Sequence, residues 1–105
     1  MSIEHRWSER KPIAMEVHLY HPSAGEVMAR TRDISLEGMF VETNATDLPV
    51  NTELEVAFTT FGKNGPEQHR VSAYVVHRNE AGVGLMLRHV EYSNFHALRY
   101  MLNAA

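Results

Sequence analysis

The chain of 105 residues contains no cysteine, only one tryptophan and four prolines. Without cysteine, neither a disulfide framework nor a zinc site built on thiolates can form. No apolar run approaches the roughly 18 residues that a membrane-spanning helix needs, and the polar, charged start is unlike a signal peptide. We therefore expect a cytoplasmic protein that does not insert into a membrane.

Basic residues are also scarce, because 10 Lys and Arg stand against 13 Asp and Glu and give a net charge of −3. This balance disfavours binding to a nucleic-acid polymer, which depends on clustered cations that neutralise several phosphates. Half of the basic residues nevertheless lie in the first third of the chain: Arg6, Arg10, Lys11, Arg30 and Arg32. This distribution favours a small anionic ligand.

The length and the hydrophobic pattern predict a single domain over residues 1–105. Six short stretches are expected to be strands, and in several of them apolar and polar residues alternate, as is typical of half-buried strands. The expected strands are 13–20, 26–34, 39–43, 53–58, 70–77 and 83–87. Apolar residues then recur at helical spacing over 93–103, with Ser93 as the expected N-cap.

These elements predict an all-β fold, a six-stranded antiparallel barrel or split, Greek-key-like sandwich over residues 13–90. The helix at 93–103 should close an open end of the barrel. Residues 1–12 are polar and show no period of a strand or helix, so we expect a flexible N-terminal arm.

Two short motifs are the candidates for a ligand site. Arg6 and Arg10 form an RxxxR pair on the arm, which alone is common on solvated segments. Asp33, Ser35 and Gly38 form a DxSxxG motif between two expected strands, which alone is also typical of an Asx or ST turn. On an extended strand Asp33 and Ser35 should face the same side, and Gly38 should permit positive φ and a close approach of a ligand.

The chemistry of these residues suits a flat, charged ligand. Arginine presents a planar fork that matches phosphate oxygens and the O6/N7 edge of guanine, and it also stacks on aromatic planes. Two arginines four residues apart can clamp such a ligand if the arm forms a turn. Asp33 can accept hydrogen bonds from guanine N1 and N2, while Ser35 and backbone N–H groups near Gly38 can hold a phosphate or ribose.

Catalytic and metal-binding motifs are not evident. None of the seven histidines lies in a GxSxG or HExxH motif, and no general base can be identified, so we do not expect an enzyme. His18 and His21 are spaced HxxH, but one lies on an expected strand and the other in a turn. No set has the tight spacing of a structural zinc site, so we expect no metal.

Taken together, in this order and with a strand between them, the two motifs resemble the PilZ domain family, bacterial receptors for cyclic di-GMP. The family pattern is RxxxR on an N-terminal arm, here 6–10, followed by [D/N]xSxxG, here 33–38. Residues 75–78 and 82–85 look like the late strand pair of that fold. The family's six-stranded barrel and following helix agree with the strands and helix expected above.

The resemblance implies a ligand site with two halves. Arg6 and Arg10 would bind the guanines and phosphates of cyclic di-GMP from the arm. Asp33, Ser35 and Gly38 would line the opposing side on the barrel. The ligand would be cyclic di-GMP itself, with no cofactor and no metal.

Four further residues are secondary candidates. His77, at the end of an expected strand, either stacks on a base or is a surface histidine, and Arg32 either adds charge or belongs to an exposed strand face. Trp7 either docks on the barrel when ligand orders the arm, which we favour, or is an exposed anchor for a partner. His5 stands where the family would have a further arginine, which leaves one ligand or an intercalated pair open, with a slight preference for the pair.

The resemblance implies a non-catalytic receptor whose arm closes over the ligand and presents a changed surface to a downstream protein in trans. That protein is not identified, and the family implies motility, adhesion or biofilm polysaccharide secretion. An alternative is a PilZ-like adaptor in pilus or motility machinery that does not bind nucleotide, although such relatives typically lack the arginines. A second alternative, a barrel that binds single-stranded nucleic acid, would need aromatic platforms in a basic groove.

Overall fold

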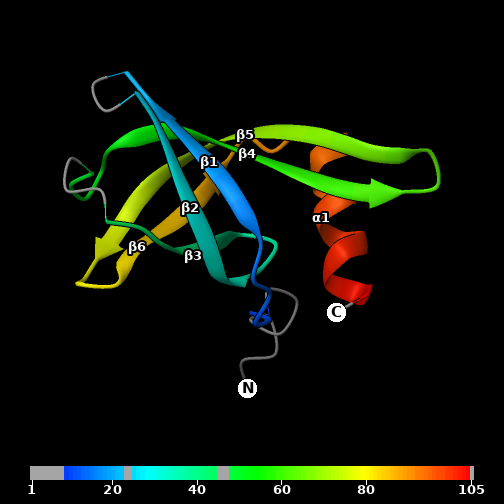
Figure 1. Ribbon diagram of the computed structural model, residues 1–105, viewed down its shortest axis with the longest axis horizontal. Coiled ribbons are helices and arrows are strands. Elements are labelled where there is room, and N and C mark those ends of the chain that lie inside the picture. The colour runs from blue at the N-terminus through cyan, green and yellow to red at the C-terminus, as the bar shows by residue number, and fades with distance from the viewer. Residues whose placement is uncertain (1–8, 23–24, 45–47, 105) are drawn as a thin grey trace.

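The computed structural model describes residues 9–22, 25–44 and 48–104. The elements, in chain order, are β1 (Glu16–His21), β2 (Gly25–Ile34), β3 (Gly38–Glu42), β4 (Glu53–Gly62), β5 (Gly65–Arg78), β6 (Gly82–Arg88) and α1 (Tyr92–Ala104). All strand pairs are antiparallel, and the strands close into a barrel in the order β1-β2-β3-β6-β5-β4 (Figure 1). The predicted fold, a six-stranded antiparallel barrel followed by one helix, is confirmed.

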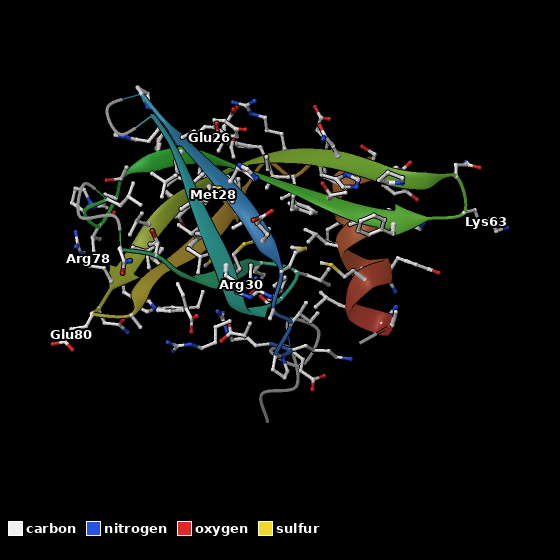
Figure 2. The ribbon with its side chains drawn as sticks, viewed as in Figure 1. Glu26, Met28, Arg30, Lys63, Arg78 and Glu80 are labelled. Atoms are coloured by element: carbon white, nitrogen blue, oxygen red, sulfur yellow. The ribbon has the colours of Figure 1, made fainter. Side chains whose placement is uncertain are left out.

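Strand alternation places one face of each strand inside the barrel. In β1, Val17 and Leu19 are buried while the residues between them are not, as the pattern predicts. On β2, Met28 and Arg30 lie on the outside (Figure 2). Successive residues of these two strands therefore face alternately into the barrel and out to solvent.

The helix α1 adds to this core and lies beside the protruding part of the β4–β5 hairpin (Figure 1). Leu98 and Leu102 are 0% and 6% exposed and belong to the main hydrophobic cluster. The predicted N-cap at Ser93 is wrong, because α1 begins at Tyr92 and the N–H of Phe95 donates to the C=O of Glu91 at 2.9 Å. No helix in the described ranges is long and apolar enough to cross a membrane.

The β4–β5 hairpin is longer than expected. Its two strands stay in register up to the pair Gly62↔Gly65, with Lys63 at the tip (Figures 1 and 2). Gly65 has a φ of 95°, a conformation that glycine adopts without strain. The pairing of β4 with β5 thus continues beyond the barrel, where side chains no longer alternate between core and solvent.

A bulge in β2 changes which residues face outward. The register of β2 against β3 shifts between Thr31 and Asp33. Thr31 is 1% exposed, so regular alternation would also turn Asp33 into the core. Because Arg32 is the extra residue, Arg32 and Asp33 both lie on the outer face, and Ile34 returns to the core at 0% exposure.

A second bulge lies in β5. The register of β5 against β6 shifts between Val75 and His77, and Val75 is fully buried. Val76 is the extra residue, so Val76 and His77 are both exposed. Both bulged strands flank the pair β3–β6, and the side chains that they turn outward lie on the same part of the barrel surface.

Candidate functional site

The end of the N-terminal arm is joined to β2. Lys11 and Ile34 exchange two backbone hydrogen bonds, Lys11 N–H to Ile34 C=O at 2.8 Å and the reverse at 2.9 Å. The buried hydroxyl of Thr31 donates to the C=O of Ile13 at 2.6 Å and accepts from the N–H of Met15 at 2.9 Å. The arm, which was predicted to be flexible over residues 1–12, is thus attached to the barrel from Lys11 onward.

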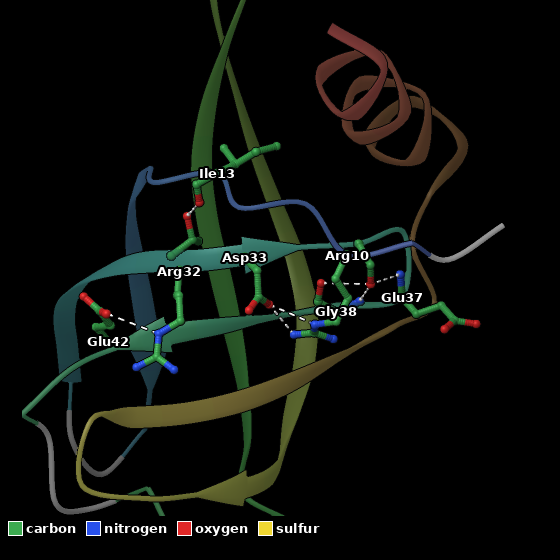
Figure 3. A network of polar contacts seen from close by, with 9 residues as sticks. Arg10, Ile13, Arg32, Asp33, Glu37, Gly38 and Glu42 are labelled. Carbon is green, nitrogen blue, oxygen red and sulfur yellow. Dashed lines mark hydrogen bonds and ion pairs between the residues drawn. The ribbon is translucent and has the colours of Figure 1, made fainter. Parts of the chain in front are cut away.

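Arg10, immediately before this attachment, forms an ion pair with Asp33. Its Nε and Nη2 groups donate to Asp33 Oδ1 at 2.9 and 2.5 Å (Figure 3). The two side chains are 51% and 27% exposed, so solvent screens the pair and its own contribution to stability is small. Both bonds end on Oδ1, and within the described part of the chain no donor is bound to Asp33 Oδ2. The structure therefore brings one member of RxxxR into contact with the acid of DxSxxG.

Ser35 forms the turn between β2 and β3. Its N–H donates to the C=O of Gly38 at 2.8 Å, and its Oγ accepts from the N–H groups of Glu37 and Gly38 at 3.2 Å each. The same hydroxyl donates to the C=O of Gly38 at 3.3 Å, and Ser35 is only 2% exposed. The expectation that Asp33 and Ser35 face the same side is wrong, because the chain leaves the strand after Ile34.

Gly38 is required by close packing of two strands. A Cβ at this position would lie 2.2 Å from the backbone oxygen of Leu85 in β6. Its φ is not positive, so the conformational reason predicted for this glycine is wrong. Ser35 and Gly38 thus hold the turn beside β6, and Asp33 is the member of the motif that faces the solvent.

A row of four paired residues crosses the outer face next to the ion pair. Asp33 of β2 pairs with Phe40 of β3, Phe40 with Gly84 of β6, and Gly84 with His77 of β5. A Cβ on Gly84 would lie 2.4 Å from His77 Nε2, so the imidazole lies directly over this glycine. There it stacks on Phe40, with ring centroids 5.7 Å apart and planes at 27°.

Arg32 covers the same aromatic ring. Its Cζ lies 4.4 Å from the centroid of Phe40, and its Nε is 3.4 Å from Glu42 Oε2 (Figure 3). Phe40 is 5% exposed although it lies outside the main core cluster, because the side chains of Arg32 and His77 shield it. The secondary candidates Arg32 and His77 therefore meet on one aromatic residue, which the sequence reasoning had missed.

These residues line a groove of about 390 Å³, within the usual range for ligand sites. Its walls include Arg10, Arg32, Asp33, Phe40, Val76, His77 and Met86. Larger depressions also occur: one of about 580 Å³ beside β2, and two of about 670 and 700 Å³ around β1, β4 and β5. Arg70 lines the last two, and its Nε is held by Glu55 Oε1 at 2.6 Å. The smaller groove is the one that joins Arg10 and Asp33 of the two motifs to the stacked rings of Phe40 and His77.

Three predicted site residues, His5, Arg6 and Trp7, lie outside the described residues. Among the described histidines, His18 is paired with Glu26 at 2.5 Å. His69 lies between Thr60 and Asn94, at 2.8 and 2.9 Å. Within the ranges that the structure describes, no three His, Asp or Glu side chains gather as a metal site would require.

Comparison with known proteins agrees with this architecture. The PilZ domain family matches residues 4–104, nearly the entire chain. The chain therefore belongs to the PilZ domain family. A comparison with curated proteins gave no match.

Two solved structures are similar in fold. The crystal structure of the PilZ domain of CeSA from a cellulose-synthesizing bacterium has a TM-score of 0.74 at 15% identity, covering 92% of this chain and 97% of that one. The Bacillus subtilis inhibitor of motility, MotI/DgrA, has a TM-score of 0.73 at 16% identity, covering 93% of this chain and 51% of that one. At these identities the likeness shows a common fold and carries no residue roles.

Proposed function

We propose that this chain is a non-catalytic receptor for cyclic di-GMP that signals to a protein partner in trans. The observation that carries the proposal is the contact of Arg10 with Asp33 at the edge of the groove. This contact joins the arm motif to the barrel motif, which lie 23 residues apart in the sequence. Membership in the PilZ family supports the choice of ligand.

Guanine recognition starts at Asp33 in this proposal. Its Oδ2 accepts from the N1 and N2 donors of a guanine, while Oδ1 stays with Arg10 or releases it to the ligand. The guanidinium groups of Arg10 and Arg6 bind the phosphates and the O6/N7 edge, for which their planar forks are suited. Ser35 and Gly38 hold the turn and bring its backbone close to the ligand.

The stacked rings of His77 and Phe40 provide the surface on which a base can lie. A guanine stacks on the exposed imidazole of His77, which Phe40 supports from below and Gly84 leaves room for. Arg32 adds positive charge at the same place. His5 supplies little charge at neutral pH, so the arm holds either one cyclic di-GMP or an intercalated pair with the remaining cations.

Ligand binding is converted into a signal by the arm. The arm is fixed at Lys11, so residues before it can close over the groove while the barrel stays unchanged. Closure orders the arm and alters the surface that a partner meets. The two similar structures belong to proteins named for cellulose synthesis and for inhibition of motility, which supports an output of that kind.

Calorimetric titration with cyclic di-GMP tests the proposal. We expect saturable binding by the wild type and a loss of at least tenfold in Arg10→Ala and in Asp33→Ala, since hydrogen bonds to charged groups contribute about 1.5–3 kcal/mol. Arg70→Ala is the matched control, because Arg70 is a similarly exposed arginine paired with Glu55 outside this groove. Equal affinity in all variants would refute the site. No binding at all would favour the adaptor alternative.

A further inference from the structure

The β4–β5 hairpin carries a strand edge that no neighbouring strand covers. β1 pairs with β4 only from Glu55 to Ala57, whereas β4 runs on to Gly62 in register with β5. Among the residues that the structure describes, none pairs with the other side of β4 over 58–62, where the hairpin projects beyond the barrel (Figure 1). We call this segment, 58–62, the β4 edge.

The backbone groups of Thr59 and Phe61 point out of the β4 edge. In an antiparallel pair, successive residues direct their N–H and C=O groups alternately to one neighbouring strand and to the other. Gly62 and Gly65 flank the two-residue turn of the hairpin and therefore bond to each other. Counting back along β4, every second residue bonds to β5, so the N–H and C=O groups of Thr59 and Phe61 face away from β5.

The β4 edge lacks the features that usually prevent strand edges from pairing, which are charged side chains, prolines and bulges. Its sequence is Phe-Thr-Thr-Phe-Gly, and its pairing with β5 shows no register shift. Phe61 is 75% exposed and borders the depression of about 700 Å³ around β1, β4 and β5. A regular, uncharged edge beside an open depression is typical of a site where another strand adds to the sheet.

The β4 edge is complementary to itself. When two copies lie antiparallel with Thr60 on a two-fold axis, Thr59 of each copy lies opposite Phe61 of the other, and each such pair exchanges both of its hydrogen bonds. In the same register, Phe58 of each copy lies opposite Gly62 of the other, which has no side chain to obstruct the ring. The positions of the outward groups and of the glycine therefore agree on one register.

Charge at the tip of the hairpin also favours a second copy. Lys63 lies at this tip (Figure 2). In the register centred on Thr60, the tip of one copy comes to the depression beside the β4 edge of the other. The lining of that depression includes Glu16, an exposed acidic residue of β1. Each Lys63 thus meets a side chain of opposite charge, which favours this orientation.

We infer that two copies of this chain associate through the β4 edge, so that the two hairpins form one continuous sheet across a two-fold axis. The association needs no ligand, because the groove that contains Arg10 and Asp33 is lined by no residue of the β4 edge. The inference therefore stands apart from the receptor function.

Sedimentation equilibrium of the full chain tests the association. The mass should rise from that of one chain toward that of two between micromolar and millimolar concentration, since a short strand pair makes a small interface. Phe61→Lys should raise the dissociation constant of the dimer roughly tenfold or more, because it removes an exposed ring and places a charge on the edge. Met28→Lys is the matched control, because Met28 is 59% exposed on β2. A chain that stays monomeric at millimolar concentration, or equal association of Phe61→Lys and the wild type, would overturn the inference.

The lack of native cysteine allows the register to be tested as well. On the two-fold axis, opposite residues that are not bonded to each other have Cα atoms about 4.5 Å apart, within the range of a disulfide. Thr60→Cys should therefore form a disulfide-linked dimer much faster than Lys63→Cys, although Lys63 is the more exposed residue. Equally fast cross-linking of the two variants would overturn the pairing of two copies and would leave a foreign strand as the occupant of the edge.

Discussion

Gly84→Ala should damage the ligand site while leaving the barrel intact. The added Cβ would lie 2.4, 2.6 and 3.1 Å from three atoms of the His77 ring, whereas ordinary contacts begin near 3.4 Å. The ring must therefore move by about an ångström or rotate away. The atoms that the new Cβ would meet belong to the exposed side chain of His77 at the end of β5, so this side chain can move while the backbone stays in place.

The magnitude follows from the contacts that are lost. The stack of His77 on Phe40 is worth about 0.5–1.5 kcal/mol, so we expect the free energy of unfolding to fall by about 1 kcal/mol. If a guanine stacks on His77, displacement of the ring should cost a further ~1–3 kcal/mol of binding, or roughly five- to 150-fold in affinity. Urea unfolding and calorimetry with cyclic di-GMP measure the two effects separately.

The control and the decisive comparison are both available in the chain. Gly62→Ala adds a Cβ with nothing within 4 Å and should leave both quantities nearly unchanged. In a His77→Ala background, Gly84→Ala should cost almost nothing more, because the displaced ring is already absent. If the losses of affinity from the two changes were fully additive, or if Gly84→Ala bound with wild-type affinity, the role of the His77–Phe40 stack would be refuted.

Three other predictions concern the turn, the arm and the charge of the site. Gly38→Ala should cost about 1–3 kcal/mol of stability, because its Cβ meets the rigid backbone oxygen of Leu85; an unchanged urea midpoint would contradict the close packing. Thr31→Val should cost about 1–3 kcal/mol because it removes the hydrogen-bond partner of two partly buried backbone groups, the C=O of Ile13 and the N–H of Met15. Increased hydrogen exchange around Lys11 should accompany the loss, whereas Thr59→Val on the outer face should be nearly neutral. Affinity for cyclic di-GMP should fall as salt rises from 0.1 to 1 M, where the Debye length shrinks from about 10 to about 3 Å, and a salt-independent affinity would argue against ion-pair recognition.

Much of the fold could be predicted from the sequence because strand alternation has a period of two. Val17 and Leu19 are buried as that period requires, and Leu98 and Leu102 are buried as helical spacing requires. The bulge at Arg32 could not be predicted in this way, because a register shift depends on the partner strand. The same holds for the length of the β4–β5 hairpin, where pairing persists without a core.

The candidate site was predictable only in part. The resemblance to PilZ domains pointed to Arg10 and Asp33, and the structure places them in contact. The role of Ser35 within its turn and the packing reason for Gly38 needed the position of β6, which no local pattern reveals. Phe40 was missed because an aromatic residue in a short strand looks like an ordinary core residue. Its role became evident only from its pairing with Gly84 of β6 in the structure.

The most direct test of the receptor function is a calorimetric titration of the wild-type chain with cyclic di-GMP, with the mononucleotide GMP as the control. We expect saturable binding of one or two cyclic di-GMP molecules per chain. We expect much weaker binding of GMP, which cannot engage both halves of the site at once. No heat of binding at tens of micromolar cyclic di-GMP, or equal affinity for GMP, would contradict it.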